Sequence, residues 1–151
     1  MEEKYLVFNV RDKRYAIQSK IIGEVAVSEK VFPLPLAPDY VRGIINRYSV
    51  PYALIDIGFL LLGEASDARK VIVLKEEVDK LAFLIDDVTD IADLSPEKLM
   101  KIEQEEAGSV SATGTALVSA FFEWKNSPVF CLDIKEMTDR IRQDFSFNRP
   151  E

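Results

Sequence analysis

Apolar and polar positions alternate in short runs along most of this chain, and polar clusters, glycine or proline end nearly every run. A period of two is typical of β-strands that place one face in a core. The pattern predicts strands at 5–10, 14–18, 43–46, 50–55, 71–75, 80–85, 116–124 and 128–132. We therefore expect a mainly β fold.

Two segments have the helical period instead. Asp56 is placed to cap a short helix over "IGFLLL", and Gly63 is placed to end it. Asp133 and Glu136 form the start signal of a longer helix over 134–146. The apolar side chains of that helix recur at steps of three and four and predict a face that packs on the core: Ile134, Met137, Ile141 and Phe145.

Two further stretches read as connections. Three prolines exclude a regular helix or a central strand from "FPLPLAPDY" at 32–40. Leu34 and Leu36 alternate with these prolines, which favours packing on a core over the alternative of an SH3 ligand at 35–38. Residues 103–114 are the most loop-like part of the chain.

The chain contains an internal repeat. "PYALIDI" at 51–57 matches "PVFCLDI" at 128–134, an offset of 128 − 51 = 77, and each copy ends in a capping aspartate. Segments 5–8 and 15–17 match segments that lie 71 − 5 = 66 positions later. Two related small β-units, each the size of a five-stranded SH3-like barrel, explain this pattern. Sharing one core would solve the marginal burial of each barrel, with a seam expected at Phe83, Ile85, Phe121 and Phe130.

Composition limits the class of protein. The chain has 151 residues, of which 48% are hydrophobic and 30% charged, as in an ordinary globular domain. Its net charge of −7 gives no electrostatic footprint for nucleic acid and would repel an anionic membrane surface. No apolar stretch approaches the length of a membrane span, and the N-terminus has no signal-peptide architecture. We therefore expect a cytoplasmic protein.

The sequence offers little material for catalysis. It has no histidine, and its single cysteine, Cys131, lies in an apolar run typical of a buried strand. Asp56 and Asp133 are better explained as helix caps than as paired catalytic carboxylates. We expect no enzyme activity, no catalytic residue, no cofactor and no metal. An acidic block is better explained as a solvated strand edge than as a cation site: Asp86, Asp87, Asp90 and Asp93.

The order of the motifs resembles that of the CheW family of chemotaxis coupling proteins. The likeness rests on "YLVFNVRDKRYAI", "VRGIIN", "ALIDI", "LLG", "VIVL", "LAFLIDDVTDI" and "VFCLDI", and extends from about residue 5 to about residue 137. It implies one CheW-like domain over 1–151, with two five-stranded SH3-like barrel subdomains around a shared hydrophobic core. The expected bounds are 15–80 for subdomain 1, 1–14 with 81–133 for subdomain 2, and 134–146 for the C-terminal helix.

The resemblance also implies a function. CheW-like proteins are non-catalytic adaptors that bridge the cytoplasmic tip of methyl-accepting chemoreceptors and the regulatory domain of the histidine kinase CheA, in arrays at the membrane. The matching kinase-facing positions are Ile22, Glu24 and Val25. The matching receptor-facing positions are Gly43, Asn46, Arg47, Tyr48, Val88 and Ile91.

One short stretch departs from the family pattern. The family usually reads Asn-Leu-Arg-Gly where this chain has Asn46, Arg47, Tyr48 and Ser49. A turn there favours glycine because the backbone needs positive φ, which serine resists. Arg47 either supplies the cation from one position earlier, or the usual contact is lost. An aromatic residue beside an arginine on a hairpin tip is typical of a protein-contact hot spot.

Two alternative functions remain open. The chain is either a divergent paralogue that contacts another protein, or a small-molecule-binding β-barrel. The second alternative requires polar side chains that converge in an apolar cavity.

Overall fold

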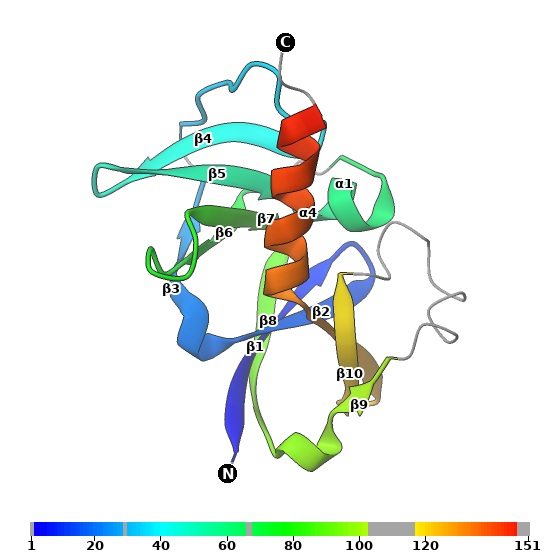
Figure 1. Cartoon of the computed structure of the whole chain (residues 1–151). Coiled ribbons are helices and arrows are strands. Elements are labelled where there is room, and N and C mark those ends of the chain that lie inside the picture. The colour runs from blue at the N-terminus through cyan, green and yellow to red at the C-terminus, as the bar shows by residue number, and fades with distance from the viewer. Residues whose placement is uncertain (1, 29, 66–67, 103–116, 148–151) are drawn as a thin grey trace.

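Two β-sheets form the body of the protein in its computed structural model, which describes residues 2–28, 30–65, 68–102 and 117–147 (Figure 1). The first sheet has the strand order β3-β6-β7-β5-β4, and the second has the order β8-β1-β2-β11-β10-β9. The first sheet contains β3 (Ile22–Val27), β4 (Val41–Arg47), β5 (Val50–Asp56), β6 (Lys70–Leu74) and β7 (Leu81–Ile85). The second contains β1 (Glu3–Val10), β2 (Lys13–Gln18), β8 (Asp87–Leu94), β9 (Met100–Lys101), β10 (Val118–Trp124) and β11 (Ser127–Leu132).

Three short helices and one long helix connect and cover the sheets among the described residues. They are η1 (Ser19–Ile21), α1 (Ile57–Leu62), η2 (Pro96–Lys98) and the long α4 (Ile134–Phe147). The predicted mainly β fold and its strands are confirmed. The expected loop at 103–114 lies outside the described residues.

The strands of the repeat pair in the same registers in both sheets. Glu24 of β3 pairs with Val73 of β6, and Asp90 of β8 pairs with Val7 of β1, so both residues shift by 66 positions. The β4–β5 and β10–β11 hairpins repeat with the offset of 77, since Arg47 pairs with Val50 where Trp124 pairs with Ser127. The internal repeat is therefore confirmed at the level of strand pairing.

Strand pairing groups some residues differently from the expected subdomain bounds. β2, expected in subdomain 1, pairs with β1 and runs parallel to β11 in the second sheet. β7, expected in subdomain 2, pairs with β6 and runs parallel to β5 in the first sheet. The strands of the first sheet therefore fall within residues 22–85, and those of the second fall within 3–18 and 87–132. The expected bounds would have divided the β1–β2 and β6–β7 hairpins between subdomains. In the structure the two strands of each hairpin pair with each other, because a short connection keeps antiparallel strands adjacent.

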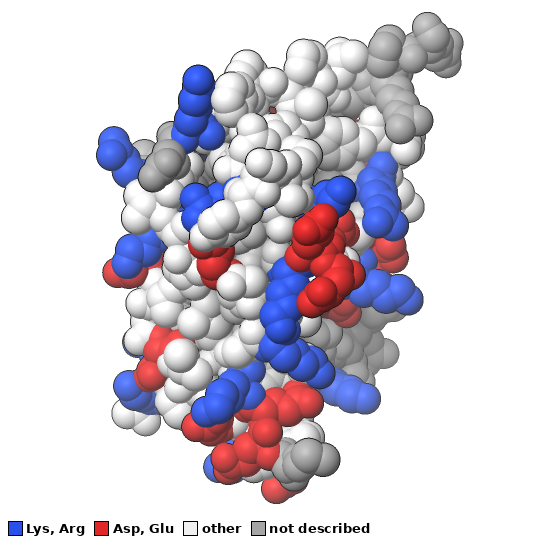
Figure 2. Space-filling view, turned by 90° about the vertical axis from the view of Figure 1, so that its left-hand side faces the viewer, with Lys and Arg blue, Asp and Glu red and all other residues white. Residues whose placement is uncertain are grey.

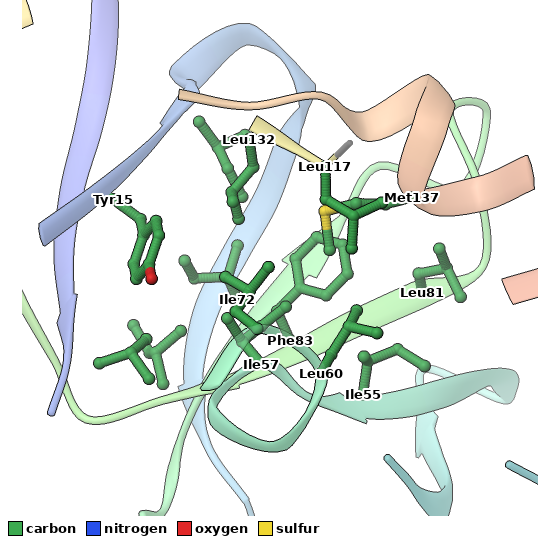
Figure 3. Packing of buried hydrophobic residues seen from close by; sticks show 14 of the residues in the cluster. Tyr15, Ile55, Ile57, Leu60, Ile72, Leu81, Phe83, Leu117, Leu132 and Met137 are labelled. Carbon is green, nitrogen blue, oxygen red and sulfur yellow. The ribbon is translucent and has the colours of Figure 1, made fainter. Parts of the chain in front are cut away.

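The hydrophobic core has a shared part and two private parts. In the β1–β2 and β6–β7 hairpins, alternate side chains face opposite sides of the sheet, as strand geometry requires. Phe8 and Tyr15 of the second sheet belong to the same shared core as Ile72 and Phe83 of the first. Figure 3 shows Tyr15, Ile72 and Phe83 in this core. Neighbouring side chains such as Val7 and Val73 point into the private cores of the two subdomains. The buried central residues of these strands are apolar because both of their faces are covered.

The expected seam is only partly right. Phe83 and Ile85 are fully buried in the shared core, and Phe130 packs against it. Phe121 is half-buried and contacts Phe130, with 6.2 Å between ring centroids. Alternation identified the apolar strand but did not separate the shared face from the outer face.

Both predicted caps are present. The Asp56 carboxylate accepts the Phe59 backbone N–H at 3.1 Å, and Gly63 ends α1 in the left-handed conformation at φ 75°. The Asp133 carboxylate accepts the Glu136 N–H at 3.1 Å at the start of α4. Met137 and Ile141 on α4 are buried in the shared core, and Ile134 and Phe145 pack against it, as the helical stripe predicts.

Asp56 is fully buried, and Arg42 neutralises it. The guanidinium Nε and Nη2 of Arg42 donate to Asp56 Oδ2 at 3.1 and 2.9 Å. We expect Arg42→Met to lower the free energy of unfolding by about 2 kcal/mol, since a buried carboxylate loses its charged donor. Urea denaturation measures the change. The control Lys13→Met, at an exposed hairpin residue, should leave it within about 0.5 kcal/mol. Equal loss in both variants would contradict this role of Arg42.

Candidate protein-contact surface

The β4–β5 hairpin ends in a strained two-residue turn. Tyr48 and Ser49 have φ of 52° and 68°, both in the left-handed region. Two positive φ values in a two-residue hairpin correspond to the type I′ turn, which normally takes Asn-Gly. Each non-glycine residue there costs about 1 kcal/mol or more. The departure from the family pattern therefore leaves a tight turn in place, at the cost of strain.

Arg47 forms a two-pronged ion pair with Glu24. Its Nε and Nη2 donate to the two carboxylate oxygens of Glu24 at 2.8 and 2.9 Å. The hydrogen bond from Arg47 is the main cause that holds the pKa of Glu24 below its usual value. Glu24 lies on β3 and Arg47 on β4, which are the opposite edges of the first sheet. The ion pair therefore closes the barrel through side chains.

The second subdomain repeats this closure with different chemistry. Asp90, the counterpart of Glu24, accepts the indole N–H of Trp124 at 2.9 Å and pairs with Lys125 Nζ at 2.6 Å. Hydrogen bonds from Lys125 and then Trp124 lower the pKa of Asp90 to about 2. Trp124 is the counterpart of Arg47 at the end of the equivalent hairpin. In both halves, therefore, an acid on an edge strand, β3 or β8, holds the end of the β4–β5 or β10–β11 hairpin.

Tyr48 is displayed at the tip of this closed barrel. Its side chain is 85% exposed, and its ring lies 5.6 Å from the guanidinium carbon of Arg47. Because Glu24 already engages the guanidinium, a partner that approaches the tip meets the phenol ring first.

The two expected sets of apolar contacts occupy equivalent positions of the repeat. Ile22 and Val88 are half-buried and pack against the shared core, each at the start of its edge strand. Val25 and Ile91 are exposed, at 45% and 55%. Val25 and Ile91 are therefore available for contact, whereas Ile22 and Val88 also support the core.

Gly43 has a structural reason to be glycine. It is buried, with φ of 144°, and a Cβ there would lie 2.2 Å from the backbone oxygen of Phe32. Phe32 of the connector bridges to Ile44 on β4 through backbone hydrogen bonds of 2.8 and 2.7 Å. Gly43 therefore admits the connector, while Asn46 on the same strand is exposed.

Six of the nine exposed large hydrophobic residues among those described fall between residues 25 and 48. We call them the apolar face: Val25, Val27, Val31, Phe32, Leu36 and Tyr48. Figure 2 shows the side of the molecule that carries the β4–β5 tip; its upper part has few charged side chains. Leu36 was expected to pack inward, but it is 59% exposed because its φ of 63° turns the proline-rich connector there.

Sequence reasoning missed most of the apolar face. The exposed residues Val25 and Val27 of β3 could have been recognised from the sequence, because apolar residues occur on both faces of that strand. Val31, Phe32 and Leu36 carried none, since an apolar residue between prolines reads equally well as packed or exposed.

Comparison with known proteins identifies the family and the fold. The family model of the CheW-like domain matches residues 4–142. The chain belongs to the CheW family. The crystal structure of scaffolding protein TtCheW from Thermoanaerobacter tengcongensis is similar in fold, with a TM-score of 0.76 and 17% identity. The match covers 89% of this chain and 86% of that one. No curated protein matches the chain.

In this CheW-like domain the structure does not keep the predicted kinase-facing and receptor-facing residues apart as two sets. Glu24, expected on the kinase side, is bonded to Arg47, expected on the receptor side. Val88 and Ile91 lie on the edge strand of the other sheet. The structure thus joins Glu24, Arg47 and Tyr48 in one cluster and leaves Ile91 in the second subdomain.

The acidic block lies along β8, an edge strand of the second sheet, and in the residue before it. Asp87 pairs with Lys70 at 2.5 Å and Asp93 with Lys4 at 3.0 Å, while Asp86 accepts a backbone N–H from Arg11. Within the described ranges, no three histidine, cysteine, aspartate or glutamate residues gather as a metal ion would need. No helix among the described residues is long and apolar enough to cross a membrane.

The Glu24–Arg47 pair predicts a pH effect. The lowered pKa of Glu24 means that its contribution to stability is present above the usual glutamate range and is lost as pH falls through the folded-state pKa. We expect Arg47→Gln to raise this pKa, measured by carboxyl ¹³C NMR titration. Asp90, with its own partners, should stay near 2 in the same spectra. An unchanged Glu24 titration in Arg47→Gln would contradict the ion pair.

The strained turn predicts a stabilising substitution. Ser49→Gly should raise the free energy of unfolding by about 0.5–1 kcal/mol, because glycine adopts positive φ without steric cost. The matched control is Asn126→Gly at the equivalent position, where φ is 65°. Asparagine tolerates this conformation, so the control should gain less. Urea denaturation compares the two, and a loss of stability in Ser49→Gly would exclude a left-handed Ser49.

Proposed function

We propose that this CheW-family protein is a non-catalytic scaffold that couples the cytoplasmic tip of methyl-accepting chemoreceptors to the regulatory domain of a CheA-type histidine kinase. Family membership over residues 4–142 supports this role, as does the fold shared with a protein described as a scaffold. The observation that carries the proposal is the apolar face with Tyr48 at its tip. On this proposal the protein is cytoplasmic and is recruited to receptor arrays at the membrane.

The apolar face has the properties of a contact surface. Aromatic residues held on rigid elements dominate binding energies because little conformational entropy is lost when they are buried. Tyr48 is held by a strained turn and by the Glu24–Arg47 pair below it. Strain at an exposed position is commonly found where a residue is presented for function. Val25 and Ile91 extend the contact to the edge strand of each subdomain.

The side chains that the sequence offers for catalysis are engaged in structure or buried. Asp56 and Asp133 cap helices. Cys131 is buried, and burial raises the pKa of its thiol to about 12, so the thiolate that a nucleophile requires is scarce at neutral pH. The two aspartates and the cysteine therefore give no support to a catalytic role, and a role in protein contact is favoured.

The small-molecule alternative requires a cavity, and the described part of the chain contains a groove large enough to consider. A groove of about 720 Å³ opens between α4 and the second sheet and is lined by Tyr5, Ala16 and Cys131 among others. At its rim Asp79 and Arg142 pair with each other at 3.9 Å. Ligand sites use polar groups that converge on a ligand. Mutual pairing of these two charges favours the scaffold over this alternative.

Binding to both partners tests the proposal. We expect the receptor cytoplasmic fragment and the kinase regulatory domain, taken from the same genome, to bind with micromolar affinity in calorimetry. Tyr48→Ala should weaken at least one contact by about tenfold, through loss of a central aromatic anchor. The control Met100→Ala removes a 42% exposed side chain from the second subdomain and should change binding less than twofold. The proposal is wrong if neither partner binds the unaltered protein at concentrations well above the micromolar range.

A further inference from the structure

A second concave surface adjoins the displayed tyrosine. A groove of about 330 Å³ lies between the β4–β5 tip and the β6–β7 turn. Both of these hairpin ends lie on the left-hand side of Figure 1, which is the side that faces the viewer in Figure 2. Its lining combines two aromatic rings, of Tyr48 and Tyr52, with charged side chains of both signs: the acids Glu24, Glu76 and Glu77, and the cations Arg47 and Lys75. This volume is at the small end for ligand sites and suits one long side chain.

Tyr52 lines this groove with an unused polar group. The residue is 94% buried, at 6% exposure, with its ring in the private core of the first subdomain. Its hydroxyl makes no hydrogen bond with any of the residues that the structure describes. The ring is buried, whereas the hydroxyl oxygen itself reaches the groove and is not among the buried polar atoms without a partner. It is placed to accept a donor that enters the groove.

The electrostatic surroundings of Tyr52 favour a cation. Burial raises the pKa of its hydroxyl first, and the negative charges of Glu76 and Glu24 raise it further. Glu24 is neutralised by Arg47, which leaves Glu76 and Glu77 against Lys75 at the rim. All three rim residues are exposed, so their side chains are able to rearrange around a charge.

We propose that this groove receives the cationic end of a lysine or arginine side chain from a protein partner. The ammonium or guanidinium group donates to the Tyr52 hydroxyl and to the carboxylates of Glu76 and Glu77. The ring of Tyr48 covers the cation or its aliphatic stem, as aromatic faces do for such groups. The inference rests on the proposed function only in taking the cation from a protein partner, and the groove is tested below without that partner.

Short peptides test the groove directly. The ¹⁵N-labelled full chain is titrated with acetyl-Gly-Lys-Gly-amide, with the arginine peptide and with the norleucine peptide, which has a similar stem without the charge. We expect the two cationic peptides to shift the backbone amides of Tyr48, Tyr52 and residues 75–77, with weak but saturable affinity. The norleucine peptide should shift them only slightly.

Variants then assign the contact. Tyr52→Phe removes the hydroxyl and keeps the ring in the core, and Glu76→Gln with Glu77→Gln removes the rim charges without changing side-chain shape. Each should weaken the cationic peptides by about two- to fivefold. The control pairs Glu97→Gln with Glu123→Gln, two exposed acids of the second subdomain, and removes the same net charge. It should leave the affinity unchanged.

Three outcomes would overturn the proposal. They are equal binding of the norleucine peptide, equal weakening by the control pair, and no saturable shift at the groove with either cationic peptide. Failure of the partner titrations with normal peptide binding would instead count against the proposed function alone. Success of the partner titrations without peptide binding would remove only the groove.

Discussion

The structure depends on one apolar layer that both sheets need. Each subdomain is too small to bury an adequate core alone. The β1–β2 and β6–β7 hairpins solve this by burying both of their faces, one in a private core and one in the shared core beside Phe8 and Phe83. α4 covers the shared core with Met137 and Ile141. Because the two hairpins are buried on both sides, functional contacts are left to the outer strands and their turns.

In each half, side chains join an edge strand to a hairpin with which it shares no ladder of backbone hydrogen bonds. Glu24 holds Arg47 across the first barrel, and Asp90 holds Trp124 and Lys125 across the second. This arrangement leaves the hairpin tips rigid and exposed. The two tips nevertheless differ: the first presents a tyrosine over an occupied guanidinium, and the second presents a lysine bound to an aspartate. A repeated scaffold therefore carries two different surfaces, and the apolar face belongs to the first.

Alternation along the sequence was enough to place most strands, both helix caps and the internal repeat, because these depend on local periodicity and on short-range hydrogen bonds. Membership of β2 and β7 in their sheets could not be obtained in this way, since parallel pairing with β11 and β5 joins segments far apart in the chain. The same limit hid the Glu24–Arg47 contact, which spans 23 positions and opposite sheet edges. Leu36 was misjudged because its exposure follows from a left-handed backbone. The sequence also could not show that the Tyr52 hydroxyl lacks a hydrogen-bond partner, because this depends on which residues surround it in three dimensions.

The parallel pairing of β2 with β11 has a consequence for how the polypeptide acquires its shape. All five strands of the first sheet fall within one continuous stretch, residues 22–85, so that sheet closes its loops within one segment. The second sheet must bring residue 16 beside residue 131 before its order is complete. Closing so long a loop is entropically expensive and slow. We therefore expect the first barrel to form before the second, so that the β1–β2 hairpin and α4 pack last on the face of β6–β7 that becomes the shared core.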